Sequence, residues 1–327
     1  MIVERIKLAK YYLFKSKNTG LSYPSVIGIE TTSRCNIDCI MCPRQEMTRQ
    51  TGDMDIKLFK KIINDIKGKV EFIWLQDYGE PFLNKNIFKM IAYAKRHGLR
   101  TGISTNATVL NNDIIVNILN SGLDYIIFAF DGATKETYEK IRKGANFEKV
   151  TNNINDFLAN KTACNTRIFT VVQCIQMENT ESEINDFVKM WKVKGVDGIR
   201  IRQVTYSGKD KFENSLNGRP CYWLWSDPHI KWDGTVVPCC QDVNAVYPLG
   251  NIKENSLGKL WNSEKMIRLR EKHISGKYHE IALCKGCNMY QPSLPLIIGS
   301  SFFRYFALNK FIPRVETILS KIRYREK

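Results

Sequence analysis

The sequence predicts an α/β protein, a partial (β/α)6 barrel of parallel strands with a small C-terminal cysteine-rich α+β module. Six short apolar segments alternate with helical patterns between residues 26 and 202. The chain has 327 residues, 43% of them hydrophobic, which is enough for one large domain or for one domain and a smaller one. Ten cysteines are present, and two sets of them are clustered, one at the start of the strand pattern and one after it.

The six predicted strands are short and rich in β-branched and aromatic residues. They span residues 26–31, 70–76, 100–104, 125–130, 167–175 and 198–202. Because helical patterns separate consecutive strands, we expect parallel pairing through right-handed crossovers. In such a barrel, functional groups collect at the C-terminal ends of the strands.

The predicted helices show apolar residues at helical spacing. The first has an apolar face ending in Ile66, and Gly68 follows where a left-handed cap is expected. A later one carries an apolar stripe from Ile184 to Trp191, with Thr180 and Glu183 before it at the spacing of a capping box. Further helices are expected near residues 86–97, 113–119, 134–142 and 147–158.

Composition divides the chain into four parts. Residues 1–25 form a basic N-terminal helix, and residues 26–207 form the barrel. Residues 208–293 begin with a polar linker and form the cysteine-rich module, with a hairpin turning at Asp233-Gly234 and a helix near 257–272. Residues 294–327 are an apolar and basic extension.

The first cysteine set follows the first strand directly. Cys35, Cys39 and Cys42 lie within eight residues in a loop that leaves this strand. Thiolates are the ligands of iron–sulfur clusters, and such a cluster normally takes four. Three thiolates leave one iron open for a substrate or cofactor. A three-cysteine zinc site, or three unrelated thiols, is the alternative.

This CxxxCxxC segment resembles the signature of the radical S-adenosylmethionine (SAM) superfamily. The resemblance implies a 4Fe–4S cluster on Cys35, Cys39 and Cys42 whose open iron is chelated by SAM. One electron would then cleave SAM to a 5′-deoxyadenosyl radical, which abstracts a substrate hydrogen. In such enzymes the cofactor supplies the difficult chemistry, and the protein orients and shields it.

Other segments resemble the family at the ends of successive strands. Tyr78-Gly79-Glu80-Pro81 is similar to the GGEP motif, with Tyr78 in place of the first glycine. The resemblance implies that the backbone and the acid of this motif hold the SAM amino group. The segments at Ser104 and Asn106, and then Asp131 and Arg142, also resemble the family. The cofactor-binding residues predicted on this basis are Gly79, Glu80, Ser104, Asn106, Asp131 and Arg142.

The second cysteine set comprises Cys221, Cys239, Cys284 and Cys287. It resembles a SPASM module shortened to the twitch form, which implies a second, auxiliary 4Fe–4S cluster with four thiolate ligands. A structural zinc site is the alternative from the residues alone, since a hairpin cysteine and a CxxC pair also occur in zinc ribbons. Cys240 could replace Cys239. If the two lie on a strand they point to opposite faces, and the spacing from the hairpin glycine favours Cys239.

Strand six suggests where a substrate binds. Arg200 and Arg202 share one face of this strand and two isoleucines share the other. Because an outer barrel face must be apolar, we expect the arginines to point inward, with Arg202 nearer the active site and able to bind an anion. A solvated edge strand is the alternative. Gln176, at the open end of strand five, is a further polar candidate. No histidine lies near a motif, so the sequence names no general base.

Charge and the chain ends limit the partners. The formal net charge of +16 favours acidic partners or serves solubility alone, and nothing resembles an RNA-binding motif, so no specific nucleic acid is expected. The N-terminus lacks a signal peptide, so we expect a cytoplasmic protein with reduced thiols. Residues 294–327 pair apolar and basic residues, which suggests either a peripheral contact at the inner membrane face or a lipid-linked substrate, or else packing over the barrel.

The predicted activity is a radical SAM oxidation. A sugar-like or aminocyclitol alcohol would become a ketone when the radical removes one hydrogen atom and the auxiliary cluster accepts the remaining electron. An electron donor such as flavodoxin or ferredoxin would supply the electron that cleaves SAM. Ribosomal peptide maturation is a second hypothesis, although only 25 residues precede the first strand, too few for a leader-binding domain. A non-catalytic iron–sulfur protein is a third.

Overall fold

The computed structural model describes residues 12–14, 22–205 and 219–289. Its centre is a nine-stranded sheet in the order β11-β10-β9-β1-β3-β4-β5-β7-β8. Six of these strands follow one another in chain order and pair in parallel, as the sequence predicts. They are β1 (Val26–Ile29), β3 (Phe72–Trp74), β4 (Arg100–Thr105), β5 (Tyr125–Ala129), β7 (Phe169–Gln176) and β8 (Gly198–Gln203).

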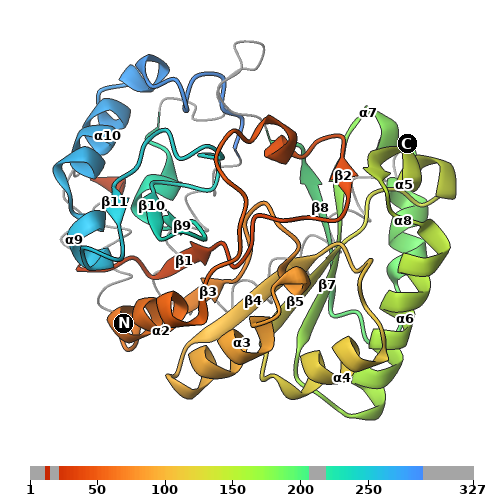
Figure 1. The fold of residues 1–327 in the computed structure, drawn as a ribbon. Helices are drawn as coiled ribbons and strands as arrows, with labels where there is room; N and C mark the ends of the chain where they lie inside the picture. Colours follow the sequence, from red (N-terminus) through yellow and green to blue (C-terminus); the bar gives the residue numbers. More distant parts are fainter. Residues whose placement is uncertain (1–11, 15–21, 206–218, 290–327) are drawn as a thin grey trace.

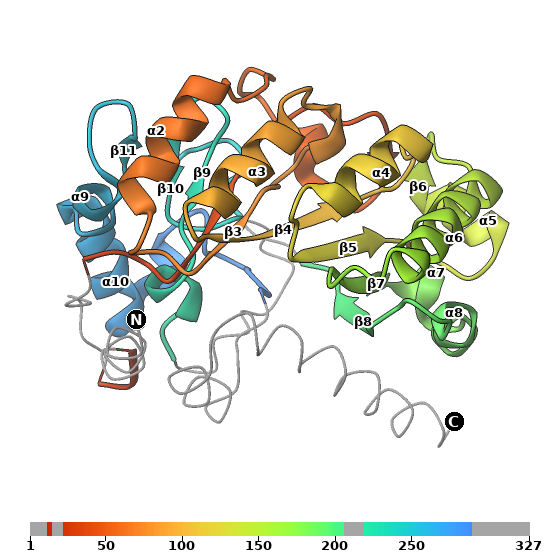
Figure 2. The ribbon, with the colours of Figure 1, turned by 90° about the horizontal axis from the view of Figure 1, so that it is seen from below.

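Helices connect these strands and line one face of the curved sheet (Figures 1 and 2). They are α2 (Ile56–Ile66), α3 (Ile87–Arg96), α4 (Asn112–Asn120), α5 (Lys135–Ile141), α6 (Phe147–Ala163), α7 (Glu178–Glu181) and α8 (Ile184–Trp191). Gly68 follows α2 with a φ of 73°, the left-handed conformation expected after its end. The partial (β/α)6 barrel is therefore confirmed. Two short 3₁₀ helices follow strands: η1 (Pro43–Glu46) follows the two-residue strand β2 (Asp38–Cys39), and η2 (Pro81–Leu83) follows β3.

The two faces of the sheet carry different residues. Residues such as Ile27, Ile73 and Phe128 point toward the helices and form the main core. The alternate residues, including Phe72, Trp74 and Tyr125, form a smaller buried cluster on the inner face. The helical stripe from Ile184 to Trp191 packs against the main core as expected.

The cysteine-rich module continues the same sheet. Strand β9 (His229–Ile230) pairs in parallel with β1 at the edge opposite β8, and β10 (Thr235–Val237) and β11 (Gly250–Asn251) add antiparallel strands (Figure 1). The predicted hairpin is confirmed, with Gly234 at a φ of 94° in its turn. The module also contains η3 (Tyr222–Trp225), α9 (Leu257–Trp261), α10 (Glu264–Ile274) and η4 (Lys277–Glu280).

Two local expectations are wrong. The single helix predicted near 257–272 is two helices, because Ser263 caps α10 through its hydroxyl, which accepts the Met266 N–H. Thr180 and Glu183 form no capping box before α8. Instead, the Glu183 carboxylate accepts hydrogen bonds from the backbone of Ala133 and Thr134, at the start of α5. A distant carboxylate therefore reinforces the start of that helix.

Three expectations concern residues that the structure describes little or not at all. The N-terminal helix is described only at residues 12–14, where the buried Tyr12 hydroxyl donates to the Pro220 carbonyl. Most of the linker and the whole extension 294–327 lie outside the described residues. Within the described ranges, no helix has the length and apolar character needed to cross a membrane.

Candidate active site

The first cysteine loop leaves the C-terminal end of β1 and is pinned by backbone pairing. Strand β2 (Asp38–Cys39) pairs antiparallel with β6 (Arg142–Lys143), which places Cys39 opposite Arg142. The Cys42 N–H donates to the Cys39 carbonyl at 3.0 Å. Burial raises the pKa of Cys39 to about 11, although Arg142 opposes this shift. Burial also raises the pKa of Cys42, and the neighbouring Cys35 thiol adds to the effect. The three thiols are thus brought together at the mouth of the barrel.

Gly79 and Glu80 lie directly against this loop. A Cβ on Gly79 would come within 2.1 Å of the Thr32 carbonyl oxygen, so only glycine permits the approach. The buried Glu80 carboxylate accepts hydrogen bonds from the Thr105 hydroxyl and the Asn106 N–H, both at 2.8 Å. Burial raises the pKa of Glu80 to about 7, with these hydrogen bonds opposing the shift. This carboxylate thus ties the ends of β3 and β4 together.

The segment after β4 reaches the same loop through Asn106. The Asn106 Nδ2 atom lies 3.7 Å from Cys35 Sγ and 3.2 Å from the side-chain oxygen Oδ1 of Asn36. Ser104 is placed differently, because its N–H donates to the Gln76 side chain at 2.6 Å on the neighbouring strand end. Both residues stand at the C-terminal edge of the sheet, where the sequence predicts them.

Asp131 and Arg142 form a buried ion pair that faces the first cysteine set. Their side chains are 2.6 Å apart, and both are less than a tenth exposed. Arg142 Nη1 lies 3.9 Å from Cys39 Sγ, while the Asp131 carboxylate also accepts the Ile175 N–H. Asp131, which follows β5 and is itself held by the backbone of β7, therefore holds the guanidinium in place, and the guanidinium presents positive charge to the thiol.

Strand β8 turns its arginines as expected. Ile199 and Ile201 pack on the helical side, whereas the buried Arg200 lies 3.2 Å from the Tyr125 hydroxyl on the inner face. Arg202 shares the face of Arg200 and lies two residues nearer the C-terminal end of the strand. Gln176 ends β7 beside it, and its side chain accepts a hydrogen bond from Gln203 at 2.8 Å.

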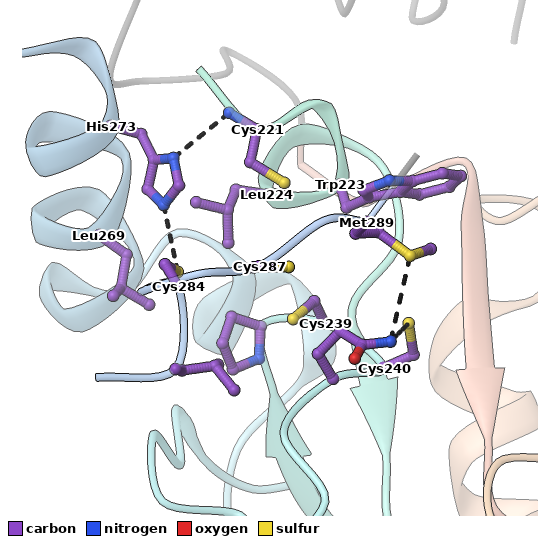
Figure 3. Close-up of a pocket in the computed structure, with 13 residues that line it drawn as sticks. Cys221, Trp223, Leu224, Cys239, Cys240, Leu269, His273, Cys284, Cys287 and Met289 are labelled. Atoms are coloured by element: carbon purple, nitrogen blue, oxygen red, sulfur yellow. Dashed lines mark hydrogen bonds between the residues drawn. The ribbon is translucent and has the colours of Figure 1, made fainter. Parts of the chain in front are cut away.

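The second cysteine set surrounds one cavity in the module (Figure 3). Its four cysteines come from the residue that precedes η3, from the turn after β10 and from the segment after η4. Apolar side chains complete the lining, among them Leu224, Leu269 and Leu283. The thiols Cys221, Cys239, Cys284 and Cys287 are thus gathered from segments more than 60 residues apart in the sequence.

Cys239 and Cys240 differ in their surroundings. Burial raises the pKa of Cys239 well above its usual value, and the thiols of Cys240, Cys284, Cys221 and Cys287 add to that shift. Burial raises the pKa of Cys240 to about 12, and its charged neighbours include Asp77 and Lys231. The premise that both lie on a strand is wrong, since β10 ends at Val237. Both residues line the cavity, and the Cys240 sulfur also lies 3.7 Å from the side-chain nitrogen of Gln241 (Figure 3).

The donor sets suit iron–sulfur clusters. The thiols of the second set line one cavity together with apolar side chains. A four-iron cluster distributes its thiolates over separate irons, so it fits thiols that line a cavity. The apolar lining also provides the low-dielectric shell that such clusters use.

Tyr78 connects the two cysteine regions. It occupies the position where the GGEP motif has its first glycine, and its hydroxyl donates to the carbonyl of Cys240. Burial raises the pKa of Tyr78 well above its usual value, so the hydroxyl stays protonated as a donor. The departure from the motif therefore has a structural role, because Tyr78 spans from the end of β3 to the loop of the second set.

Buried charges line the seam between β1, β3 and β9. Lys231 pairs with Asp77 at 2.6 Å, and both side chains are at most 3% exposed. His229 lies 3.5 Å from Asp77 and 3.8 Å from Asp227. Although burial lowers the pKa of His229, these two carboxylates raise it to about 9. The His229 ring fits only because Gly28 faces it, since a Cβ there would come within 2.3 Å.

Sequence reasoning missed this seam and a histidine in the second site. His273 lies between Cys221 and Cys284 with both ring nitrogens engaged (Figure 3). Burial lowers its pKa to about 4, so the ring is neutral. Its helical position, eleven residues before Cys284, gives no motif signal. The charge pairs join residues about 150 positions apart, and no local pattern indicates them.

Comparisons with known proteins agree with this geometry. The model of the radical SAM superfamily matches residues 29–187, and that of the SPASM iron–sulfur cluster-binding domain matches residues 221–288. A tungsten-containing aldehyde ferredoxin oxidoreductase cofactor-modifying protein from Pyrococcus furiosus is 25% identical over 295 residues, covering 74% of this chain and 82% of its own.

A S-adenosyl-L-methionine-dependent 2-deoxy-scyllo-inosamine dehydrogenase from Niallia circulans is 22% identical over 275 residues, with coverage of 81% and 92%. The crystal structure of BtrN with AdoMet and 2-DOIA superposes with a TM-score of 0.57 at 21% identity, again over 81% and 92% of the two chains. Streptococcus suis SuiB bound to precursor peptide SuiA gives a TM-score of 0.61 at 13% identity, over 76% and 66%. The chain belongs to the radical SAM superfamily and is a radical SAM enzyme with a C-terminal SPASM iron–sulfur domain.

Proposed function

We propose that this enzyme oxidises a sugar-like or aminocyclitol alcohol to a ketone. The observation that carries the proposal is the single auxiliary set, in which Cys221, Cys239, Cys284 and Cys287 line one cavity. Four thiolates complete the ligation of one cluster and leave no iron open for substrate. A closed cluster suits electron transfer. The similarity to the Niallia circulans dehydrogenase over 92% of its length also supports it.

Each site residue has a proposed role. Residues 26–207 hold SAM, with Cys35, Cys39 and Cys42 as ligands of the first cluster, and residues 208–293 hold the auxiliary cluster. When bound, these groups supply a hydrogen-atom abstractor and a one-electron acceptor. The proposed SAM-binding residues, placed at the mouth of the barrel, are Gly79, Glu80, Ser104, Asn106, Asp131, Arg142 and Gln176.

The substrate side of the reaction needs an anchor and an acceptor for one proton, and we propose that solvent takes this proton because no general base is assigned. Oxidation of an alcohol to a ketone removes two electrons and two protons: one hydrogen atom, one electron and one further proton. Arg202 projects from the inner face of β8 near its open end, and we propose that it hydrogen-bonds the substrate hydroxyl. A guanidinium there orients the oxygen and stabilises the charge that develops when its proton leaves.

The first test measures iron, sulfide and EPR spectra of anaerobically reconstituted protein. Wild type should hold about eight irons, and the Cys35→Ala/Cys39→Ala/Cys42→Ala variant about four. About four irons falling to none, with zinc bound, would remove the electron-acceptor role of the module. The second test supplies SAM, dithionite and a panel of aminocyclitols and sugars. Equal amounts of 5′-deoxyadenosine and ketone support the oxidation proposal. Formation of 5′-deoxyadenosine with no ketone product from any of the substrates contradicts it.

Peptide modification is the second candidate. A mycofactocin maturase from Mycobacterium ulcerans is 23% identical over 190 residues, although the match spans only half of that protein. The fold likeness to SuiB favours the same class. Deuterium transfer from a labelled peptide into 5′-deoxyadenosine, with no ketone from any alcohol, would replace the oxidation proposal with this one. A protein that binds both clusters and yields no 5′-deoxyadenosine would be non-catalytic.

Partners of the enzyme are also proposed. Flavodoxin or ferredoxin would supply the electron, and residues 294–327 would contact an anionic membrane or a lipid-linked substrate. Co-sedimentation with anionic liposomes tests the membrane contact. Binding that is unchanged after deletion of residues 294–327 would contradict it.

A further inference from the structure

A buried histidine bridges two of the four thiol-bearing residues of the auxiliary site. His273 lies in the last turn of α10 and is 3% exposed. Its Nδ1 atom is 3.3 Å from the backbone nitrogen of Cys221, and its Nε2 atom is 3.3 Å from Cys284 Sγ (Figure 3). Tyr278 lies beside the imidazole, with the ring centroids 5.7 Å apart. The ring is therefore held from several sides.

These contacts fix the tautomer. A backbone N–H can only donate, so Nδ1 must accept the hydrogen bond from Cys221. A neutral imidazole with an accepting Nδ1 carries its proton on Nε2. That N–H then faces Cys284 Sγ. The structure thus builds one fixed N–H donor to one sulfur, and the donor is oriented by the chain segment that supplies another thiol.

A hydrogen bond to a ligand sulfur affects the electron affinity of a cluster. Reduction adds negative charge that is shared with the sulfurs, so a donor stabilises the reduced state more than the oxidised state. Apolar residues make up much of the remaining lining, among them Leu224 and Leu269, and such a low-dielectric shell strengthens the effect. A donor at this position therefore raises the reduction potential.

We propose that His273 is a positioning residue that raises the reduction potential of the auxiliary cluster by donating Nε2–H to Cys284. The inference rests on the proposed four-cysteine cluster, and it explains how that cluster accepts an electron from a substrate. The role differs from ligation, because all four thiols remain available to the irons. It also differs from simple packing, which needs no donor.

The test uses the full chain with Cys35→Ala/Cys39→Ala/Cys42→Ala, so that only the auxiliary cluster contributes to the EPR signal. Three variants of His273 separate the donor role of Nε2 from the acceptor role of Nδ1. His273→Gln places an amide N–H near the position of Nε2, and His273→Asn keeps an acceptor for Cys221 but has no donor that reaches Cys284. His273→Leu removes both. Iron content is measured first, and midpoint potentials follow from an EPR-monitored redox titration.

About four irons in the parent protein, which is the triple-cysteine variant with His273 intact, confirm the auxiliary cluster. Fewer irons would contradict the proposed function before His273 is tested. With the cluster present, we expect His273→Gln to titrate near the parent and both His273→Asn and His273→Leu to shift to more negative potentials. Unchanged potentials in His273→Asn and His273→Leu overturn the proposal. Loss of iron in all three variants also overturns it, in favour of a ligand role for His273.

Discussion

Removing the Lys231 ammonium should loosen the seam between the barrel and the module. Lys231 and Asp77 are 1% and 3% exposed, with charged atoms 2.6 Å apart. Lys231→Met keeps much of the side-chain volume but leaves the Asp77 carboxylate buried beside His229 alone. Breaking such a buried pair from one side costs about 3–5 kcal/mol when the remaining charge is uncompensated, and the protonated His229 beside Asp77 should bring the cost toward the lower end of this range.

A double-mutant cycle isolates this charge effect. Asp77→Asn should also destabilise, since it leaves the Lys231 ammonium without its carboxylate. The double variant Asp77→Asn/Lys231→Met should lose less than the sum of the two single variants, because neither unpaired charge remains. Lys189→Met is the matched control, since Lys189 and Asp186 form an ion pair with side chains 77% and 67% exposed. Its cost should be about 1 kcal/mol or less.

Urea denaturation followed by tryptophan fluorescence measures these changes in anaerobic protein with equal iron content. Each variant is compared with wild type at the same pH and salt concentration. If Lys231→Met costs no more than Lys189→Met, or if the two single effects simply add, the seam is not held by the Lys231–Asp77 pair. In that case, backbone pairing and apolar packing alone would account for docking of the module.

Three further variants test other parts of the site. Gly79→Ala should abolish SAM binding measured by calorimetry, because its Cβ would collide with a loop carbonyl at 2.1 Å; unchanged affinity would contradict this reading of the motif. Tyr78→Phe should cost about 1–3 kcal/mol in urea denaturation, because a buried carbonyl loses its donor. The matched control is Tyr138→Phe, which should be neutral, since the Tyr138 hydroxyl has no hydrogen-bond partner among the described residues. Finally, because the folded pKa of His229 is raised from 6.5 to about 9, its stabilising contribution is complete below pH 6.5 and is lost as pH rises through 9. The free energy of unfolding of wild type should therefore fall over this window relative to His229→Gln, and parallel profiles would show that the pKa is not raised.

The order of the barrel strands could be predicted because each strand is a local apolar run. The strand at 198–202, for example, alternates isoleucine and arginine, and the structure places Arg200 on the inner face. The cysteine sets were found for the same reason, since ligand spacing is a short-range signal. The hairpin at Asp233-Gly234 follows from turn chemistry that two residues fix.

Features that depend on distant pairs were not predictable. Glu183 has capping-box spacing to Thr180, but its carboxylate accepts a hydrogen bond from the hydroxyl of Thr134, at the start of a helix about 50 residues earlier. Parallel pairing of β9 with β1 joins segments about 200 residues apart, and no local pattern reports it. The role of Tyr78, which departs from the motif, is not visible locally because its partner Cys240 lies 162 residues further along the chain.

The pairing of β9 with β1 has a consequence for the solubility of the barrel. The Gly28 N–H donates to the Pro228 carbonyl and the Glu30 N–H to the Ile230 carbonyl, so the module satisfies the open edge of β1. A chain shortened to residues 1–207 would expose that edge, together with Ile27 and Ile29 beside it, as a template for other strands. Such a fragment should self-associate, whereas in the whole chain the sheet ends at the two-residue strand β11, which offers little backbone for a neighbour to pair with. The cysteine-rich module therefore covers the edge of β1 that the barrel strands alone would leave unpaired.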